Sequence, residues 1–243
     1  MKNKPTGKSV LLFSGGLDSY IISKLEKVNV LLYLPHRNRY EKAEYRTVCL
    51  LEDRGFLKGS ELIIKENLDL GEFEREDAII PLRNLFLLSM AALYGEKLYI
   101  GAVYGDRTLD KSLDFMSKLE DMLNYLYQEQ HWCEERKFEV VAPYKEYTKT
   151  QLVAKYLEEG YPIEGLLTSF SCYDSKSTKP CNKCKPCVRK AVALLNNNIE
   201  VKGFKFKNVP WLQPNTEIYN QLVSGKNEYR GKEDEDFRKA MQL

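Results

Sequence analysis

Short apolar runs alternate with longer amphipathic segments along the first hundred residues. Runs of this length, rich in aliphatic side chains and bounded by turn residues, are typical of buried strands. They cover residues 9–13, 28–34, 61–65 and 97–101. The segments between them repeat apolar residues at helical spacing and predict helices over residues 17–25, 40–54 and 83–93. Strands that alternate with helices predict an α/β fold, a parallel sheet with helices on both faces.

The pattern changes after residue 105. One long helix is expected over residues 109–130, and a further strand is expected over residues 138–142. Thr148 and Gln151 have the spacing of a capping box, in which each side chain satisfies a backbone donor at the start of a helix. This region therefore continues the α/β pattern with more helix than strand.

The sequence beyond Asn198 is polar and carries a charged run over residues 226–238. We expect an irregular segment here, either mobile or bound to a partner. The predicted organisation has three parts, a core over residues 1–105, a helical and metal-binding region over residues 106–198, and an extension over residues 199–243.

Charge and hydropathy exclude several classes of protein. The chain of 243 residues has 37 Lys and Arg against 35 Asp and Glu, a net charge of +2, which argues against a dedicated nucleic-acid-binding protein. No apolar run approaches the roughly 20 residues that span a bilayer. The first eight residues lack the apolar stretch of a signal peptide, so we expect a cytoplasmic location. Disulfides are rare there, and clustered cysteines then indicate metal ligands or catalytic thiols.

A glycine-rich loop follows the first predicted strand, with the sequence Ser14-Gly-Gly-Leu-Asp-Ser19. Glycines let the backbone approach an anion, and the next helix offers unpaired amides and the positive end of its dipole. Asp18 is unusual beside a phosphate, and we expect it either to cap the helix or to hold a magnesium ion. The loop has neither the Walker A ending nor the dinucleotide-binding spacing. A plain glycine turn before a capped helix is the alternative.

Four cysteines lie close together in the sequence with the spacing C-x8-C-x2-C-x2-C, at positions Cys172, Cys181, Cys184 and Cys187. Two overlapping C-x2-C steps can turn thiolates toward one tetrahedral ion, and four thiolates leave no position for water. The cluster therefore predicts one structural zinc ion per chain. Nearby cations, among them Arg189 and Lys190, are expected to offset the thiolate charge. The alternatives are an iron–sulfur cluster, a redox thiol pair or coincidence.

The glycine-rich loop resembles the PP-loop of the N-type ATP pyrophosphatases, which have a Rossmann-like fold of the adenine nucleotide alpha hydrolase type. That resemblance implies that the loop binds ATP with magnesium as a co-substrate. The implied nucleotide contacts are Phe13, Ser14, Gly15, Gly16, Leu17, Asp18, Ser19 and Tyr20.

Taken together, the loop and the cysteines resemble the 7-cyano-7-deazaguanine synthase (QueC) family over residues 8–195. Three further stretches agree, residues 80–84, 101–106 and 171–173. The resemblance implies an ATP-dependent ligase that converts 7-carboxy-7-deazaguanine and ammonia to the nitrile, and it implies a homodimer. The implied cleft residues are Asp18, Arg83, Asn84, Asp106 and Lys149.

The sequence departs from the family over residues 34–40, where His36 and Arg39 either replace cleft residues or lie in an exposed loop. Two further functions stay open at this point. One is a diverged relative that stops at the amide or uses another carboxylate or amine. The other is a zinc-knuckle module that binds nucleic acid, with little support from the net charge.

Overall fold

Five parallel strands form one sheet in the part of the chain that this computed structural model describes, residues 4–65, 69–174 and 179–243. The strands are β1 (Ser9–Leu12), β2 (Val30–Tyr33), β3 (Glu61–Ile64), β4 (Lys97–Tyr99) and β5 (Glu139–Val141). Their order is β3-β2-β1-β4-β5, with Val10 of β1 paired to Val30 on one side and Leu98 on the other. The sequence-based prediction of a parallel sheet is confirmed.

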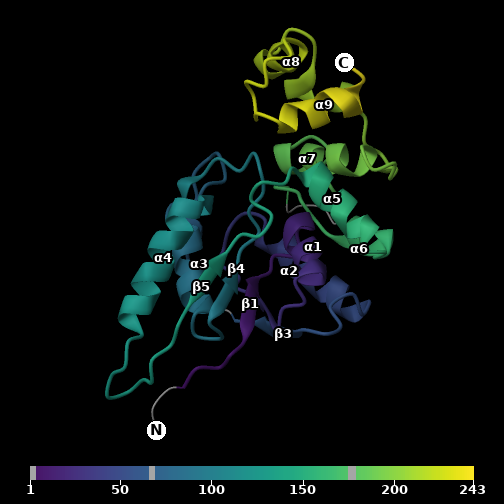
Figure 1. Cartoon of the computed structure of the whole chain (residues 1–243). Helices are drawn as coiled ribbons and strands as arrows, with labels where there is room; N and C mark the ends of the chain where they lie inside the picture. Colours follow the sequence, from purple (N-terminus) through teal and green to yellow (C-terminus); the bar gives the residue numbers. More distant parts are fainter. Residues whose placement is uncertain (1–3, 66–68, 175–178) are drawn as a thin grey trace.

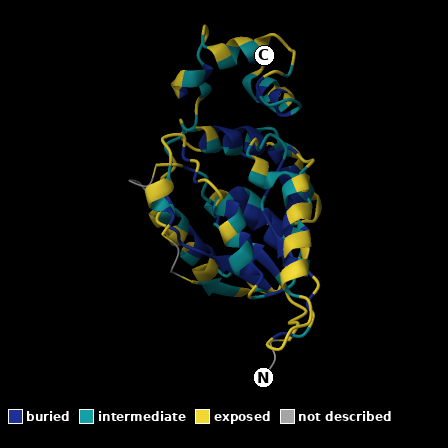
Figure 2. Ribbon diagram, turned by 90° about the vertical axis from the view of Figure 1, so that its left-hand side faces the viewer, coloured by how far each residue is buried: buried dark blue, intermediate teal, exposed yellow. Residues whose placement is uncertain are grey.

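Helices cover both faces of this sheet (Figure 1). On one face lie α1 (Leu17–Leu25), α2 (Glu41–Asp53), α5 (Lys149–Glu158), α6 (Ile163–Thr168) and part of α7 (Lys185–Leu195). The opposite face carries α3 (Arg83–Ala91) and α4 (Leu113–Leu126). Alternate residues of a strand point to opposite faces. Val10 therefore joins the α3/α4 core, whereas Leu11 joins the core beneath α1. Figure 2 shows that the strands at the centre of the sheet are largely buried, and β2 is buried throughout, whereas the edge strand β3 is partly exposed.

The single long helix expected over residues 109–130 was wrong at both ends. A short 3₁₀ turn occupies Leu109–Lys111, and α4 begins only at Leu113 because the Ser112 hydroxyl caps it, accepting from the Phe115 amide at 3.1 Å. The helix ends at Leu126, after which the Arg136 amide bonds the Tyr127 carbonyl at 3.0 Å. The chain turns back here and leads into β5.

The irregular extension expected after Asn198 was also wrong. The segment forms α8 (Glu217–Val223) and α9 (Glu233–Met241), together with the 3₁₀ turns Phe206–Asn208 and Pro210–Leu212. Apolar side chains from these elements form a third core against α7, whose buried members are Val188, Val192, Val209, Leu212, Leu222, Tyr229 and Phe237. Figure 1 shows α8 and α9 stacked above α7. No helix in the described ranges is both long enough and apolar enough to cross a bilayer.

A buried arginine, Arg136, links the segment that leads into β5 to the turn after α3. The Arg136 side chain is 1% exposed, its Nε lies 2.7 Å from Glu96 Oε1, and its Nη2 donates to the Ala92 carbonyl at 2.8 Å. Removing one member of a buried ion pair leaves the other charge without compensation. We expect Arg136→Met to lower the free energy of unfolding by about 3 kcal/mol in urea titrations.

The matched double variant Arg136→Met/Glu96→Gln removes both charges and should recover part of that loss. A single variant as stable as the parent protein would contradict this account of the pair.

Candidate functional site

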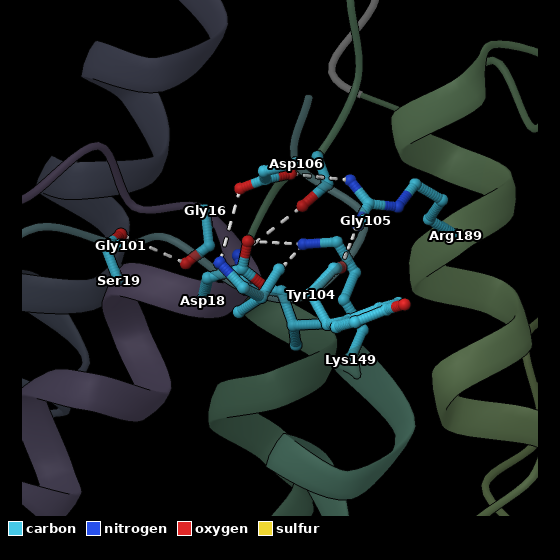
Figure 3. Close-up of polar contacts among 12 residues, drawn as sticks. Gly16, Asp18, Ser19, Gly101, Tyr104, Gly105, Asp106, Lys149 and Arg189 are labelled. Carbon is cyan, nitrogen blue, oxygen red and sulfur yellow. Dashed lines mark hydrogen bonds and ion pairs between the residues drawn. The ribbon is translucent and has the colours of Figure 1, made fainter. Parts of the chain in front are cut away.

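The glycine-rich loop lies at the carboxyl end of β1, the central strand. From β1 the sheet extends through β2 and β3 on one side and through β4 and β5 on the other. Ligands of open α/β sheets bind where the strand order reverses in this way. Gly101, which follows β4, lies against the loop, since a Cβ built on it would be 3.6 Å from the Ser19 amide nitrogen (Figure 3). The loop therefore occupies the crevice between the ends of β1 and β4.

The loop itself needs its first glycine. Gly15 has a φ of +70°, and a Cβ on it would lie 3.1 Å from Thr47 Cγ2. Hydroxyl groups gather around the same turn, since Ser14 Oγ and Ser19 Oγ are 3.5 Å apart. Ser171 contributes a third hydroxyl, 3.4 Å from the Leu17 amide. The turn thus presents hydroxyls and the first amides of a helix, which are donors suited to an anion.

Three of the predicted nucleotide contacts have hydrophobic side chains that are buried in the core. Phe13, Leu17 and Tyr20 all lie in the core beneath α1, and the Tyr20 hydroxyl is 3.2 Å from that of Tyr156. Any contact that these residues make with a nucleotide would have to come from their backbone atoms.

Asp18 does not cap α1. The N-cap is Gly16, and the Asp18 carboxylate instead forms an ion pair with the Nζ of Lys149 (Figure 3). Lys149 is the first residue of α5, where the predicted capping box is confirmed: Thr148 Oγ1 accepts from the Gln151 amide at 3.3 Å, and Gln151 Oε1 accepts from the Thr148 amide at 2.9 Å. Burial lowers the pKa of Lys149, and Asp18 opposes that effect. The cap therefore fixes a buried cation beside the loop.

Asp106 lies close by and holds two cations. Its carboxylate is 2.9 Å from Lys111 Nζ and 3.0 Å from Arg189 Nη1, and it accepts from the Val103 amide at 3.3 Å. Burial alone would raise its pKa, but Lys111 and Arg189 hold the pKa of Asp106 well below its usual range. Asp106 is therefore an ionised carboxylate at the end of β4, on the same side of the sheet as the glycine-rich loop.

Arg189 has other partners than the cysteines expected for it, whereas Lys190 interacts electrostatically with Cys187. Arg189 donates from Nε to Glu233 at 2.8 Å and from Nη2 to the Tyr104 carbonyl at 3.1 Å, in addition to its Asp106 contact. Lys190 bonds the carbonyl and the hydroxyl of Ser169, and burial lowers the pKa of Lys190 to about 7. Both residues follow Cys187 within three positions of α7, so the helix that begins at the cysteines also carries these two basic side chains.

Arg83 and Asn84 make a separate set of contacts at the start of α3. Arg83 Nη1 donates to the Tyr40 hydroxyl at 3.0 Å, and the Tyr40 ring stacks on Tyr173 with centroids 5.2 Å apart. Asn84 Nδ2 donates to the Asp110 carbonyl at 3.3 Å. Burial raises the pKa of Tyr173, and the nearby charges of Lys111 and Arg83 offset part of this increase. Tyr173 thus links this group to the ion pairs around Asp106, although Arg83 and Asn84 join none of those pairs.

The loop over residues 34–40, whose sequence differs from that of the family, is held in place by hydrogen bonds and an ion pair. His36 is buried, its Nδ1 lies 2.9 Å from the Leu34 carbonyl and its Nε2 lies 2.7 Å from Asn38 Nδ2. A neutral ring that donates from Nδ1 and accepts at Nε2 satisfies both contacts, and burial lowers the pKa of His36. Arg39 pairs with Glu74 at 2.8 Å. The expectation of an exposed loop was therefore wrong for His36.

The four cysteines gather as a metal site requires. Their Sγ atoms all lie within 4.8 Å of one another, and the pairs Cys181–Cys187 and Cys172–Cys184 are 3.9 Å apart. A tetrahedral ion with bonds of about 2.3 Å to sulfur sets its ligands about 3.8 Å apart. Cys184 is the N-cap of α7 and Cys187 lies in its first turn, where the helix dipole favours thiolates. These residues fit one four-coordinate metal ion.

The arrangement as a whole is suited to an anionic ligand with several charges. Two carboxylates, Asp18 and Asp106, lie among four basic side chains, Lys111, Lys149, Arg189 and Lys190. Hydroxyls and helix amides lie beside them in the loop. Such a site can hold a polyphosphate, and Asp18 can offer oxygen to a divalent cation bound with it.

Comparison with known proteins gives concordant findings. Residues 41–198 match the family model described as queuosine biosynthesis protein QueC. A 7-cyano-7-deazaguanine synthase of Campylobacter hominis is 29% identical over 227 residues, 82% of this chain and 94% of that protein. That of Archaeoglobus fulgidus is 28% identical, covering 79% and 88%, and synthase 1 of Colwellia psychrerythraea is 25% identical, covering 79% and 95%.

Among solved structures, the U34-tRNA thiolase NcsA of Methanococcus maripaludis with its 4Fe-4S cluster is 16% identical. It covers 91% of this chain and 73% of its own, with a TM-score of 0.39. A score this low supports no argument about fold or ligand.

Proposed function

Since the chain belongs to the QueC family of queuosine biosynthesis proteins, we propose that it converts 7-carboxy-7-deazaguanine and ammonia to 7-cyano-7-deazaguanine at the expense of ATP. The observation that carries this proposal is the placement of the glycine-rich loop, with its Asp18, beside Lys149 and Asp106 at the carboxyl end of the sheet. That placement supplies donors for a polyphosphate and a carboxylate for magnesium in one crevice.

A carboxylate resists attack by ammonia because it carries negative charge and has no good leaving group. In the proposed reaction its oxygen attacks the α-phosphorus of ATP and pyrophosphate leaves. Ammonia then attacks the carbonyl carbon, AMP leaves, and the amide results. A second ATP activates the amide oxygen in the same way, and loss of AMP and a proton gives the nitrile.

The residues divide this work by position. Ser14, Gly15, Gly16 and Ser19 would bind the phosphates through hydroxyls and amides, and Asp18 would hold the magnesium ion that travels with ATP. Lys149 would stabilise charge on the leaving pyrophosphate, since it is buried beside the loop. Arg83 and Asn84 would contact the deazaguanine, whose planar ring suits the stacked pair Tyr40 and Tyr173.

The ion at the four cysteines is proposed to be zinc with a structural role. Four thiolates complete a tetrahedral sphere and leave no site for water. In a 4Fe-4S cluster each cysteine binds a different corner iron, which requires sulfurs further apart than the 3.9 Å seen here. The ion would fix the start of α7, the helix that carries Arg189 and Lys190 into the site. The homodimer and the cytoplasmic location remain predictions.

Purified protein supplied with magnesium, ATP, ammonia and 7-carboxy-7-deazaguanine should release the nitrile together with AMP and pyrophosphate. Mass spectrometry identifies the deazaguanine product, and chromatography of the nucleotides distinguishes AMP from ADP. An amide that accumulates as the end product would change the product assigned but keep the adenylating chemistry. Formation of ADP, or no ATP cleavage with this carboxylate, would refute the proposal.

A further inference from the structure

The C-terminal segment beyond the family match contacts the loop that carries Asp106. The match ends at residue 198. Arg230 donates to the Gly105 carbonyl, and the Nζ of Lys232 lies 4.3 Å from the centroid of the Tyr104 ring. Glu233, the first residue of α9, pairs with Arg189 at 2.8 Å. Residues 230–233 thus engage residues 104–106 through backbone, ring and ion-pair contacts.

Glycines allow this close approach from both sides. Gly105 has a φ of +84°, and a Cβ there would collide with Glu233 Oε2 and lie 3.3 Å from Arg189 Nη2. Gly231 has a φ of +62°, and a Cβ there would collide with the Tyr104 hydroxyl. Because φ is positive at both positions, a side chain there would strain the backbone, and it would also displace the end of the Glu233 or Tyr104 side chain. The fit at this junction is therefore specific at residues 105 and 231.

Charge connects the junction to the site. The Glu233 side chain is 3% exposed, so its carboxylate needs a compensating charge, which Arg189 supplies at 2.8 Å and Arg230 from a longer distance of 3.9 Å. Arg189 donates from Nη1 to Asp106 and from Nη2 to the Tyr104 carbonyl (Figure 3). Its Nε donates to Glu233. A planar guanidinium held at three points cannot turn without losing one of them. Glu233 therefore fixes the orientation in which Arg189 meets Asp106.

We propose that Glu233 is a positioning residue of the site, which acts through Arg189 to hold the Asp106 loop beside Lys149. The C-terminal segment would then be a part of the active site rather than an appendage. The effect on catalysis rests on the proposed function, whereas the effect on the loop does not.

Three variants test this. Glu233→Gln removes the charge with little change in shape, and Glu233→Asp keeps the charge on a shorter side chain. Glu235→Gln is the matched control, because it makes the same chemical change on an exposed residue of α9 whose side chain accepts from Asn227 at 3.0 Å. We expect Glu233→Gln to lower kcat for AMP formation about tenfold, as for loss of a charged hydrogen bond, with KM for ATP little changed. Glu233→Asp should recover part of this loss, and Glu235→Gln should match the parent protein.

Amide hydrogen exchange gives a readout that needs no activity. Exchange over residues 101–107 should be faster in Glu233→Gln than in Glu235→Gln. The two variants are compared at the same interval below their thermal unfolding midpoints, so that a difference reports local opening. If the parent protein cleaves no ATP with this carboxylate, the proposed function fails and the exchange comparison alone decides the positioning role. If Glu233→Gln does not fold, Glu233→Asp takes its place in both measurements. Equal kcat and equal exchange in the Glu233 and Glu235 variants would overturn the inference.

Discussion

Replacing Asp18 by Asn is expected to lower kcat for AMP formation by about 10³-fold, the loss typical of removing one preorganised electrostatic group from an active site. The substitution keeps the shape of the side chain. It removes the charge that compensates Lys149 and the oxygen ligand proposed for magnesium. Without Asp18 the pKa of the buried Lys149 falls further, so less of this lysine is charged, and magnesium loses a ligand. Both effects weaken the binding of the departing pyrophosphate. The measurement is steady-state AMP formation at saturating ATP.

A matched control is Asp53→Asn, which alters an exposed aspartate at the end of α2 and should leave kcat unchanged. Because the Asp18 variant leaves Lys149 buried without its partner, circular dichroism must establish that the protein remains folded. A double variant with Lys149→Met tests the pairing directly. If the two residues act as a unit, the double variant loses no more than the worse single variant. An Asp18→Asn protein that keeps most of its kcat would refute the phosphate role of the loop.

Replacing Cys184 by Ser is expected to release the metal ion and to destabilise the region around α7. This cysteine is both a predicted ligand and the N-cap of α7, so its loss opens the metal site and frees the start of the helix. Structural zinc contributes its binding free energy to folding, about 10 kcal/mol or more in isolated zinc-binding peptides. We expect the zinc content to fall from one ion per chain to a trace, measured by plasma mass spectrometry.

The local unfolding has its own reporter. Trp211 donates to the Lys183 carbonyl between the cysteines at 2.7 Å and packs near Tyr229 and Phe237. Its fluorescence should change at a lower urea concentration in Cys184→Ser than in the parent protein. Cys49→Ser, which alters a cysteine of α2 outside the cluster, is the control and should change neither the metal content nor the transition. A full zinc complement in Cys184→Ser would contradict the assignment of Cys184 as a ligand. Iron in place of zinc in the parent protein would refute the assignment of the metal.

Features that depend on neighbouring residues were predictable from the sequence. Each strand is a short apolar run because both faces of the sheet are covered, so no polar alternation interrupts it. The capping box at Thr148 and Gln151 is a contact between residues three apart, and the structure has it as predicted. The glycine-rich loop was recognised from its place directly after the first apolar run, and the structure adds that Gly15 has a positive φ.

Features that depend on distant partners were not predictable in the same way. Arg189 seemed to belong to the cysteines next to it, but its partners are Asp106 and Glu233, which only the folded chain brings together. The helices after Asn198 were missed because both are short and α9 is rich in charge. Their few apolar residues gain a core only by packing on α7. The start of α4 depends on the Ser112 cap, and Ser112 is one of several polar residues in that stretch with a side chain able to cap a helix.

The position of β1 at the centre of the sheet has a consequence for how the protein folds. Ser9 pairs with Lys97, so the first strand gains its second neighbour only after a long stretch of chain has been brought back to it. Contacts between residues so far apart in sequence require loop closure before they give any stabilisation, and they slow folding relative to helical bundles of local contacts. Until β4 arrives, one edge of the apolar β1 stays unpaired, which makes the partly folded chain prone to association.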